Sequence, residues 1–561
     1  MGVLRLTKEE EYAYWTEIYR NCVDSRRDIE QQWVKYYNAV DDQLFVGRKN
    51  ADKSDVIEIN ELSSIVETII PNIILKPGSV EVRAVNEEDI YRAVIYEYIA
   101  KYILRHYNIR DQFIRTVFDT LVLGDGLVKV GYWLLPLIQD AQWRAGMSSS
   151  SRSGGFVDVG ESAFALHTKL FEFYPDYHID DWSQQRFFIH EVWKHISEFE
   201  DNDLYDKKVV KRLKPSLVEK DLYSTTTGNF DFLKKKEYVK VQEIHDLINA
   251  KMKIMSYDSG AGEFLYDNDV LYPIIPFERL AFGYRPMKIW GSSVSQKIYQ
   301  HVKSLSKYHS ALDSLLGKLG ITKVLYNQAL WKADMIKKLE ASSDSVIGIA
   351  GPPTGSYEVM DLGISSKQFV FDRAIALKEE TIRSISGVTR SQMGEHDVGA
   401  KTAFEVNVLK GSADVKMAMR LELFESFASR VMEKLLYIVS IEYEPARVAQ
   451  MTGIRADVVD GLMQPYDPSR FVLSYGESAM EANNERLQKL TFLLNSGLPL
   501  NPVEFGRIFM DALNLEYTDN LILPGIPMGK PTPARAQQSD QNVSKPGNRQ
   551  EQGIGNREIE D

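Results

Sequence analysis

Residues 292–319 carry the strongest helical pattern in the chain. Seven apolar residues fall on one side of a helix with 3.6 residues per turn, and Gly320 follows where a C-terminal cap glycine is expected. The opposite side is basic: between Arg285 and Lys318 there are six Lys or Arg residues and one acid, Asp313. We therefore predict a long helix with one packed face and one basic face, although a simple solvated face also explains the lysines. The apolar residues are Val294, Ile298, Val302, Leu305, Leu312, Leu316 and Leu319, and the lysines that line up opposite them are Lys303, Lys307 and Lys318.

The segments after this helix alternate between short β-like runs and long helices. Residues 320–367 hold apolar runs around a turn of sequence Gly351-Pro352-Pro353-Thr354-Gly355. We expect three short strands here, at 322–326, 345–349 and 357–360. The pattern then predicts a helix over 368–386, a polar loop over 387–401 and a long helix over 402–443, which the Gly411-Ser412 pair should kink.

The N-terminal half mixes helices with short strands. Helices are expected over 8–39, 90–107 and 109–122, with Asn108 as the N-cap of the third. The glycine-rich turn at 123–126 should lead from that helix into a strand over 127–133. A Ser/Gly-rich stretch, 140–165, is expected to be a flexible loop, and short strands and turns should follow to about residue 283. The predicted fold class is α+β, mostly helical.

The C-terminal part should end in disorder. A helix over 480–495 ends at a Gly-containing C-cap signal, and Asn501-Pro502 opens another helix. After Pro524 the chain turns to Pro, Gly, Gln, Ser and charged residues, a composition that buries too little apolar surface to fold.

Charge and composition limit the possible functions. The formal net charge is −12, so the chain should repel DNA at long range, and any DNA contact must be local or weak. Its single cysteine, Cys22, excludes an internal disulfide and fits a reducing cytoplasm. The first 15 residues turn acidic, so we expect no signal peptide. The most apolar window, 65–75, is shorter than the roughly 20 residues of a membrane span, so no membrane contact is expected.

No local motif indicates catalysis, a cofactor or a metal. His190 and His195 resemble a zinc-protease pair, but they are five residues apart, whereas two ligands on one helical face need a spacing of four. The surrounding sequence also alternates like a strand. A P-loop for ATP is absent from the sequence. We therefore expect a protein that is not an enzyme. Two alternatives stay open: a hydrolase based on scattered carboxylates, and a non-viral helical scaffold that binds protein partners.

The order of segments from residue 290 to 443 resembles the phage portal proteins, the head-to-tail connector family. The most specific match runs from Ser386-Gly387-Val388-Thr389-Arg390 to Gly399-Ala400-Lys401-Thr402-Ala403-Phe404-Glu405-Val406, which is similar to the family's passage across the tunnel loop into its kinked helix. Phe404 departs from that pattern, since the family often has a small polar residue there. Looser similarity extends over most of residues 8–520.

The resemblance implies an architecture and a set of partners. The family forms a homo-oligomeric ring, usually of twelve subunits, at one capsid vertex, and double-stranded DNA passes through its channel. The implied partners are the terminase large subunit, head-tail adaptor proteins, and the major capsid and scaffolding proteins, in the virion and, during assembly, in the host cytoplasm. The implied parts are the N-terminal wing (1–284), stem helix (285–319), clip (320–367), second stem helix (368–386), tunnel loop (387–401), long kinked helix with wing return (402–477), helical crown (478–523) and tail (524–561).

Three groups of residues become candidate contacts under this resemblance. The tunnel loop would offer Arg390, Ser391, Gln392, Glu395, Asp397 and Lys401 to weak, sequence-independent DNA contact, although a plain solvated loop is an equal alternative. The basic stem face would offer Lys303, Lys307 and Lys318 to DNA or to the capsid. The clip would offer Trp331 and the turn Gly351, Pro352, Pro353, Thr354 and Gly355 to the terminase or an adaptor.

Overall fold

The computed structural model describes residues 7–41, 44, 57–74, 79–133, 162–200, 202, 204–215, 238–319, 324–326, 357–359, 364–389, 393 and 403–476 of the 561-residue chain. The chain divides into two units, Met1–Ala482 and Asn483–Asp561, and the described residues all belong to the first. Of these residues, 55% are helical and 19% lie in strands of several small antiparallel sheets. The predicted mixed α+β class, dominated by helix, is therefore confirmed.

Helix α1 (Lys8–Val40) begins at a capping box. The Thr7 hydroxyl accepts a hydrogen bond from the Glu10 N–H (3.3 Å), and the Glu10 carboxylate accepts one from the Thr7 N–H (2.8 Å). This exchange satisfies N–H groups that a helix start leaves without partners. The helix contributes to two cores, because Trp15 packs against a five-stranded sheet while Trp33 enters the main core.

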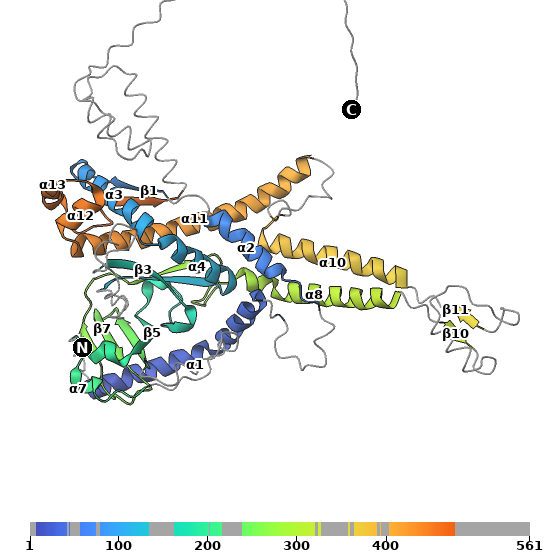
Figure 1. The fold of residues 1–561 in the computed structure, drawn as a ribbon, viewed down its shortest axis with the longest axis horizontal. Helices are drawn as coiled ribbons and strands as arrows, with labels where there is room; N and C mark the ends of the chain where they lie inside the picture. Colours follow the sequence, from blue (N-terminus) through green and yellow to red (C-terminus); the bar gives the residue numbers. More distant parts are fainter. Residues whose placement is uncertain are drawn as a thin grey trace, which may run out of the picture. The chain divides into compact units, whose positions relative to one another are not determined.

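The five-stranded sheet is antiparallel, in the order β4-β5-β6-β7-β8, and lies beside α1 (Figure 1). Neighbouring residues of a strand point to opposite faces. Ile189 and Ile244 therefore face α1, whereas His190 and Glu243 face a second sheet. The strands are β4 (Phe173–Pro175), β5 (Phe187–His195), β6 (Tyr238–Asp246), β7 (Lys251–Met255) and β8 (Tyr266–Asp269).

The second sheet has three antiparallel strands in the order β3-β2-β9, and helix α4 packs on it. Helix and central strand approach so closely that a Cβ at Gly126 would lie 2.2 Å from the Thr116 carbonyl oxygen. The predicted turn at 123–126 does join α4 to β2. The bounds are α4 (Ile109–Val122), β2 (Asp125–Trp133), β3 (Ser162–Thr168) and β9 (Phe277–Ala281).

The main core is built around α4 and the long helix α11 (Ala403–Glu442). Phe113 of α4 meets Phe424 and Phe427 of α11 edge-on, with ring centroids 5.6 and 5.7 Å apart. Around them lie α2 (Glu61–Ile74), α3 (Ile90–His106), α12 (Pro445–Thr452), α13 (Ala456–Leu462) and a two-stranded sheet of β1 (Val80–Ala84) and β12 (Phe471–Tyr475). Short helices occupy connections: η2 (Glu87–Asp89), η4 (Leu170–Glu172), η5 (Trp182–Gln184), α6 (Ile196–Glu200) and α7 (Lys207–Val210).

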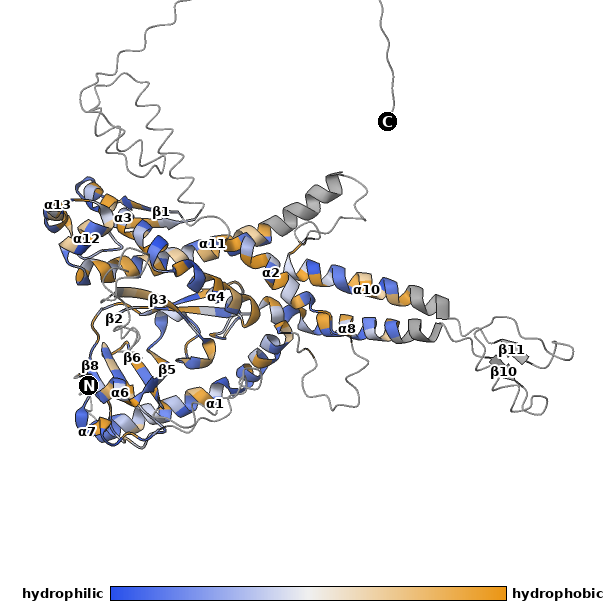
Figure 2. Ribbon diagram, in the orientation of Figure 1, coloured by the Kyte–Doolittle hydropathy of each residue, from blue (hydrophilic) through white to orange (hydrophobic). Residues whose placement is uncertain are grey.

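Helices α8 (Val294–Leu319) and α10 (Ile364–Ser386) form a hairpin. They run antiparallel, because His301 of α8 meets Lys378 of α10 while Tyr308 meets Phe371. Figure 2 shows hydrophilic and hydrophobic bands alternating along both helices, as expected when one face of each is covered. The sequence between them carries an antiparallel pair, β10 (Val324–Tyr326) and β11 (Tyr357–Val359).

Several predicted boundaries need correction. Residues 162–165, assigned to a flexible loop, belong to β3, because pairing with β2 across Trp133↔Ser162 and its neighbours satisfies their backbone. Asn108 is the N-cap residue of α4 as predicted, but its side chain makes no capping hydrogen bond, and its backbone is left-handed at φ 52°. Residues 364–367, assigned to the clip, are the first turn of α10. Helix α11 begins and ends one residue inside the predicted bounds of 402 and 443.

Candidate functional site

The hairpin α8–α10 is the part of the described chain that contains the predicted functional helices. Its base is fixed by Asp125, which is fully buried at the start of β2. One Asp125 oxygen accepts a hydrogen bond from Arg279 Nε of β9 at 2.6 Å. The other accepts one from the Gly291 N–H, also at 2.6 Å, three residues before α8 begins. The carboxylate therefore ties the start of the hairpin to the three-stranded sheet.

The charge state of Asp125 reflects two opposing effects. Burial raises the pKa of Asp125, while Arg279 and the Gly291 N–H favour its charged form and oppose that rise. A buried carboxylate with such partners is stable only while both remain in place. The sequence indicated a turn at Gly124-Asp125-Gly126 but not this ion pair, because its partners lie more than 150 residues further along the chain.

Glycines let the two backbones meet at this junction. Gly124 has φ +115°, and a Cβ there would lie 2.7 Å from the Gly291 carbonyl oxygen. A Cβ at Gly291 would in turn lie 2.8 Å from the Gly124 oxygen. Both positions therefore require glycine, by conformation at Gly124 and by space at both.

Helix α8 has the packed face and the basic face that its sequence predicted. Val294, Ile298, Val302 and Leu305 are buried, which confirms the first half of the apolar stripe. On the other side Lys307 is exposed, and Lys303 extends over the Tyr299 ring with its Nζ 5.8 Å from the centroid. Lys318 lies in the last turn of α8, and its side chain is outside the described residues, as are those of Leu316 and Leu319.

Helix α11 crosses the C-terminal end of α10. Lys416 Nζ donates to the Ser384 carbonyl oxygen at 2.7 Å, and Arg420 Nη2 donates to the Ser386 oxygen at 2.7 Å. Cations near a helix C-terminus interact favourably with its dipole and its unpaired carbonyls. Sequence reasoning missed these two cations, since nothing local says that α11 returns to this point. They fix the spacing of the two helices that flank the predicted tunnel loop.

Most of the other predicted site residues cannot be compared with the structure. The tunnel-loop candidates and the clip candidates lie outside the described residues. They are Arg390, Ser391, Gln392, Glu395, Asp397 and Lys401 in the loop, and Trp331, Gly351, Pro352, Pro353, Thr354 and Gly355 in the clip.

A buried charge cluster joins the two larger sheets. The Glu243 carboxylate of β6 pairs with Lys129 of β2 and with Lys194 of β5 (3.1 Å), and His190 Nδ1 lies 3.4 Å from it. Lys129 and Lys194 stand in mainly apolar strand sequences. This was the one feature of the sequence that could have indicated a buried charge cluster. His190 and His195, the rejected zinc pair, lie on β5, so the strand prediction for this segment is confirmed.

The pKa values of the titratable groups in this cluster are strongly shifted. Burial alone would raise the pKa of Glu243, but Lys129, Lys194 and His190 hold it well below its usual range. Burial, together with the Lys129 ammonium, lowers the pKa of His245 to about 3. Burial, again with Lys129, also lowers the pKa of His190. The two histidines are therefore neutral at neutral pH. The ion pairs of Glu243 with Lys129 and Lys194 link β2 to the five-stranded sheet.

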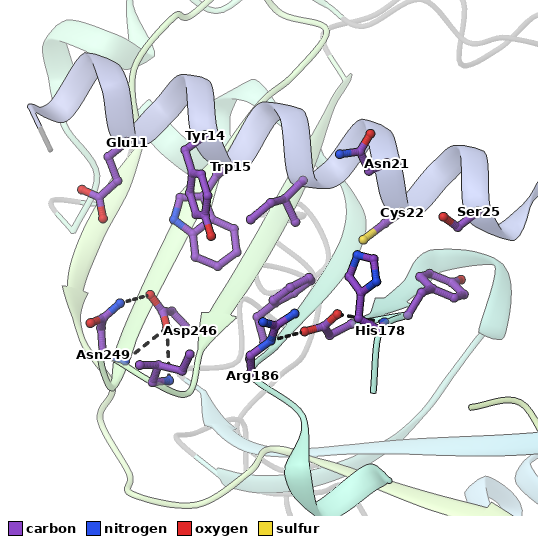
Figure 3. A pocket seen from close by; sticks show the side chains of 15 residues that line it. Glu11, Tyr14, Trp15, Asn21, Cys22, Ser25, His178, Arg186, Asp246 and Asn249 are labelled. Atoms are coloured by element: carbon purple, nitrogen blue, oxygen red, sulfur yellow. Dashed lines mark hydrogen bonds and ion pairs between the residues drawn. The ribbon is translucent and has the colours of Figure 1, made fainter. Parts of the chain in front are cut away.

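A pocket of about 360 Å³ lies between α1 and the edge of the five-stranded sheet (Figure 3). Cys22 lines it, and burial raises the pKa of this thiol to about 12. A nucleophilic cysteine needs a lowered pKa, so this thiol is not activated. On the wall, Arg186 Nε pairs with Asp176 at 2.5 Å, and Asn249 Nδ2 donates to Asp246 at 2.7 Å. These polar groups are therefore paired with one another, and their contacts link the loops that line the pocket.

Comparison with known proteins found no family model and no curated protein that matches the chain. None of the helices that the structure describes combines the length and apolar composition of a membrane span.

Proposed function

We propose that the protein is a phage portal protein, a subunit of a ring through which double-stranded DNA enters and leaves a viral head. The main support for this proposal is the order of the elements from β9 to α11. The chain leaves a body of small sheets through α8, passes an antiparallel strand pair, and returns through α10. After a short interval α11, 40 residues long, crosses the end of α10 and enters the main core. Stem, clip, second stem and long helix follow one another in this order in portals.

The charge of the chain supports the same function. Each subunit has a formal charge of −12, so a ring would repel phosphate along its channel. A translocating duplex needs such a wall, because every phosphate that is neutralised strengthens binding and retards sliding. Positive charge is local, on the α8 face with Lys303 and Lys307, where weak contact with DNA or with the capsid is proposed.

The same proposal assigns roles to the tunnel loop, to the clip and to the outside of the ring. Arg390 and Lys401 would touch DNA phosphates from the tunnel loop, while Glu395 and Asp397 would keep that contact weak. The clip, with Trp331 and the 351–355 turn, would bind the terminase during packaging and adaptor proteins afterwards. Capsid and scaffolding proteins would contact the outside of the ring.

Electron microscopy of the purified full-length chain tests the proposal. We expect annular particles with a central hole and a mass that is a multiple of 64.1 kDa, usually twelvefold in the family. Light scattering should show the same large species over a range of salt concentrations. Compact monomers at every protein and salt concentration would refute the ring and favour a monomeric enzyme or scaffold.

A further inference from the structure

The pocket between α1 and the edge of the five-stranded sheet has four aromatic residues in its wall, Tyr14, Trp15, Tyr177 and Phe187. Trp15 meets Phe187 edge-on, with ring centroids 5.5 Å apart, and Tyr14 meets Trp15 in the same way at 5.7 Å. Trp15 and Phe187 are buried, whereas Tyr14 is 51% exposed. Aromatic faces carry partial negative charge, so a pocket with several rings in its wall attracts cations.

The charged residues in the wall of this pocket are mostly acids. Glu11, Asp176 and Asp246 line it together with one arginine, Arg186, so the formal charge of the lining is −2 when histidine is counted as neutral. Asp176 pairs with Arg186 Nε at 2.5 Å, and the two charges offset each other. The remaining negative charge of the lining therefore belongs to Glu11 and Asp246.

Neither of these two acids has a cation to itself. Glu11 pairs with Lys253 at 3.0 Å, but the same ammonium group pairs with Asp267 at 2.7 Å. Asp246 is 4% exposed, and its oxygens accept hydrogen bonds from two backbone N–H groups and from Asn249 Nδ2. It forms no ion pair with the residues that the structure describes. A buried carboxylate without a cation favours a ligand that supplies one.

The two acids share one end of the pocket with two of the aromatic rings. Figure 3 shows Glu11, Tyr14 and Trp15 of α1 at the end of the pocket where Asp246 lies. Arg186, which is paired with Asp176, lies further along the pocket in the same view. Carboxylates beside aromatic faces suit an ammonium group, because both attract the cation while the rings cover the apolar body that carries it.

We infer that this pocket binds a small organic cation, an amine on an apolar body. The ammonium group lies between Glu11 and Asp246, and the apolar body packs against Trp15 and Phe187. The volume of about 360 Å³ falls within the range of small-molecule sites. The inference is independent of the proposed ring, because the site is built by one chain alone.

Isothermal titration calorimetry of the full-length chain with 3-phenylpropylamine tests this site. The matched probe is 3-phenylpropionate, which has the same ring and chain length and the opposite charge. We expect the amine to bind about tenfold more tightly than the carboxylate. Equal affinity for the two probes, or an amine that does not bind, would overturn the inference.

The lysine side chain of a partner protein offers the same ammonium chemistry as a free amine. A third probe, N-acetyl-lysine methylamide, separates these two sources. It has no aromatic body to place against Trp15 and Phe187, so we expect it to bind more weakly than 3-phenylpropylamine. Tighter binding of the lysine derivative would indicate a protein partner and overturn the assignment to a small molecule.

A pair of variants on α1 locates the bound amine. Glu11→Gln should weaken binding of 3-phenylpropylamine by about fivefold, because it removes one charge from the site. Glu17→Gln is the matched control: it changes the net charge equally, on an exposed residue of the same helix that does not line the pocket. Circular dichroism should show equal helix content in both variants. Equal affinities in the two variants would place the amine elsewhere and overturn the site.

Discussion

The buried His245 should make the stability of the folded chain depend on pH. In the folded chain its pKa is about 3, against an ordinary value of 6.5, because the ring is buried and Lys129 is close. The unfolded chain therefore binds a proton below pH 6.5 that the folded chain rejects. Stability should fall as the pH falls from 6.5 toward 3, and it should be insensitive to this group above pH 6.5.

The loss of stability is set by how far the pH lies below 6.5, the ordinary pKa of histidine. One pKa unit corresponds to about 1.4 kcal/mol, so lowering the pH from 7 to 5 should remove about 2 kcal/mol through His245 alone. His190 acts in the same direction, because burial and Lys129 lower its pKa as well. Glu243 acts only at lower pH, since its pKa is held well below 4.5 and its contribution is lost below that value.

Urea unfolding at pH 7 and pH 5, followed by circular dichroism and tryptophan fluorescence, measures this loss. We expect His245→Leu to lose about 2 kcal/mol less than the wild type between the two pH values. His178→Leu, which changes an exposed histidine in the same domain, should lose as much as the wild type. Equal losses in wild type and His245→Leu would refute the assignment of the acid sensitivity to this cluster.

Three further changes test the Asp125 junction, the packing of α4 on β2 and the proposed DNA contact. Asp125→Ala leaves a buried arginine without its partner and should cost about 3–5 kcal/mol in urea unfolding; wild-type stability would contradict the buried ion pair. Gly126→Ala should cost about 1–3 kcal/mol by forcing α4 away from β2, whereas Gly461→Ala, with open space around its Cβ, should be neutral or stabilising. The double change Arg390→Ala with Lys401→Ala should leave assembly intact and alter the packaging rate in vitro, most at low salt. If the packaging rate of the double variant equals that of the wild type at both low and high salt, the proposal that residues 387–401 contact DNA is wrong.

The long helices were predictable because their signals are local. The stripe beginning at Val294 and the cap at Gly320 placed α8 to within two residues at its start. Helix α4 was placed at its observed bounds with Asn108 at its N-cap position, although the Asn108 side chain makes no capping hydrogen bond. Asparagine is common both as a side-chain cap and at positions with a left-handed backbone. The sequence alone therefore does not tell which of the two Asn108 does.

The contacts that build the site were not predictable, because they are distant in sequence. Asp125 meets Gly291 across 166 residues, and Lys129 meets Glu243 across 114. Lys129 stands out as a charged residue in an apolar strand, but the sequence does not show that its partner is Glu243 on another sheet. The pairings of β1 with β12 and of β2 with β9 also join strands that are far apart in the sequence, which no local pattern encodes.

The junction at Asp125 also bears on how a ring of such subunits could close. Closure requires the same rotation at every interface, so a small change in hairpin direction would be repeated at each contact. Asp125 holds the start of α8 to β9 through Arg279, and Gly124 and Gly291 bring the backbones into direct contact. To swing the hairpin, the chain would have to break a buried ion pair at a cost of about 3–5 kcal/mol. The contacts of Asp125, Gly124 and Gly291 therefore set the direction in which the α8–α10 hairpin leaves the three-stranded sheet.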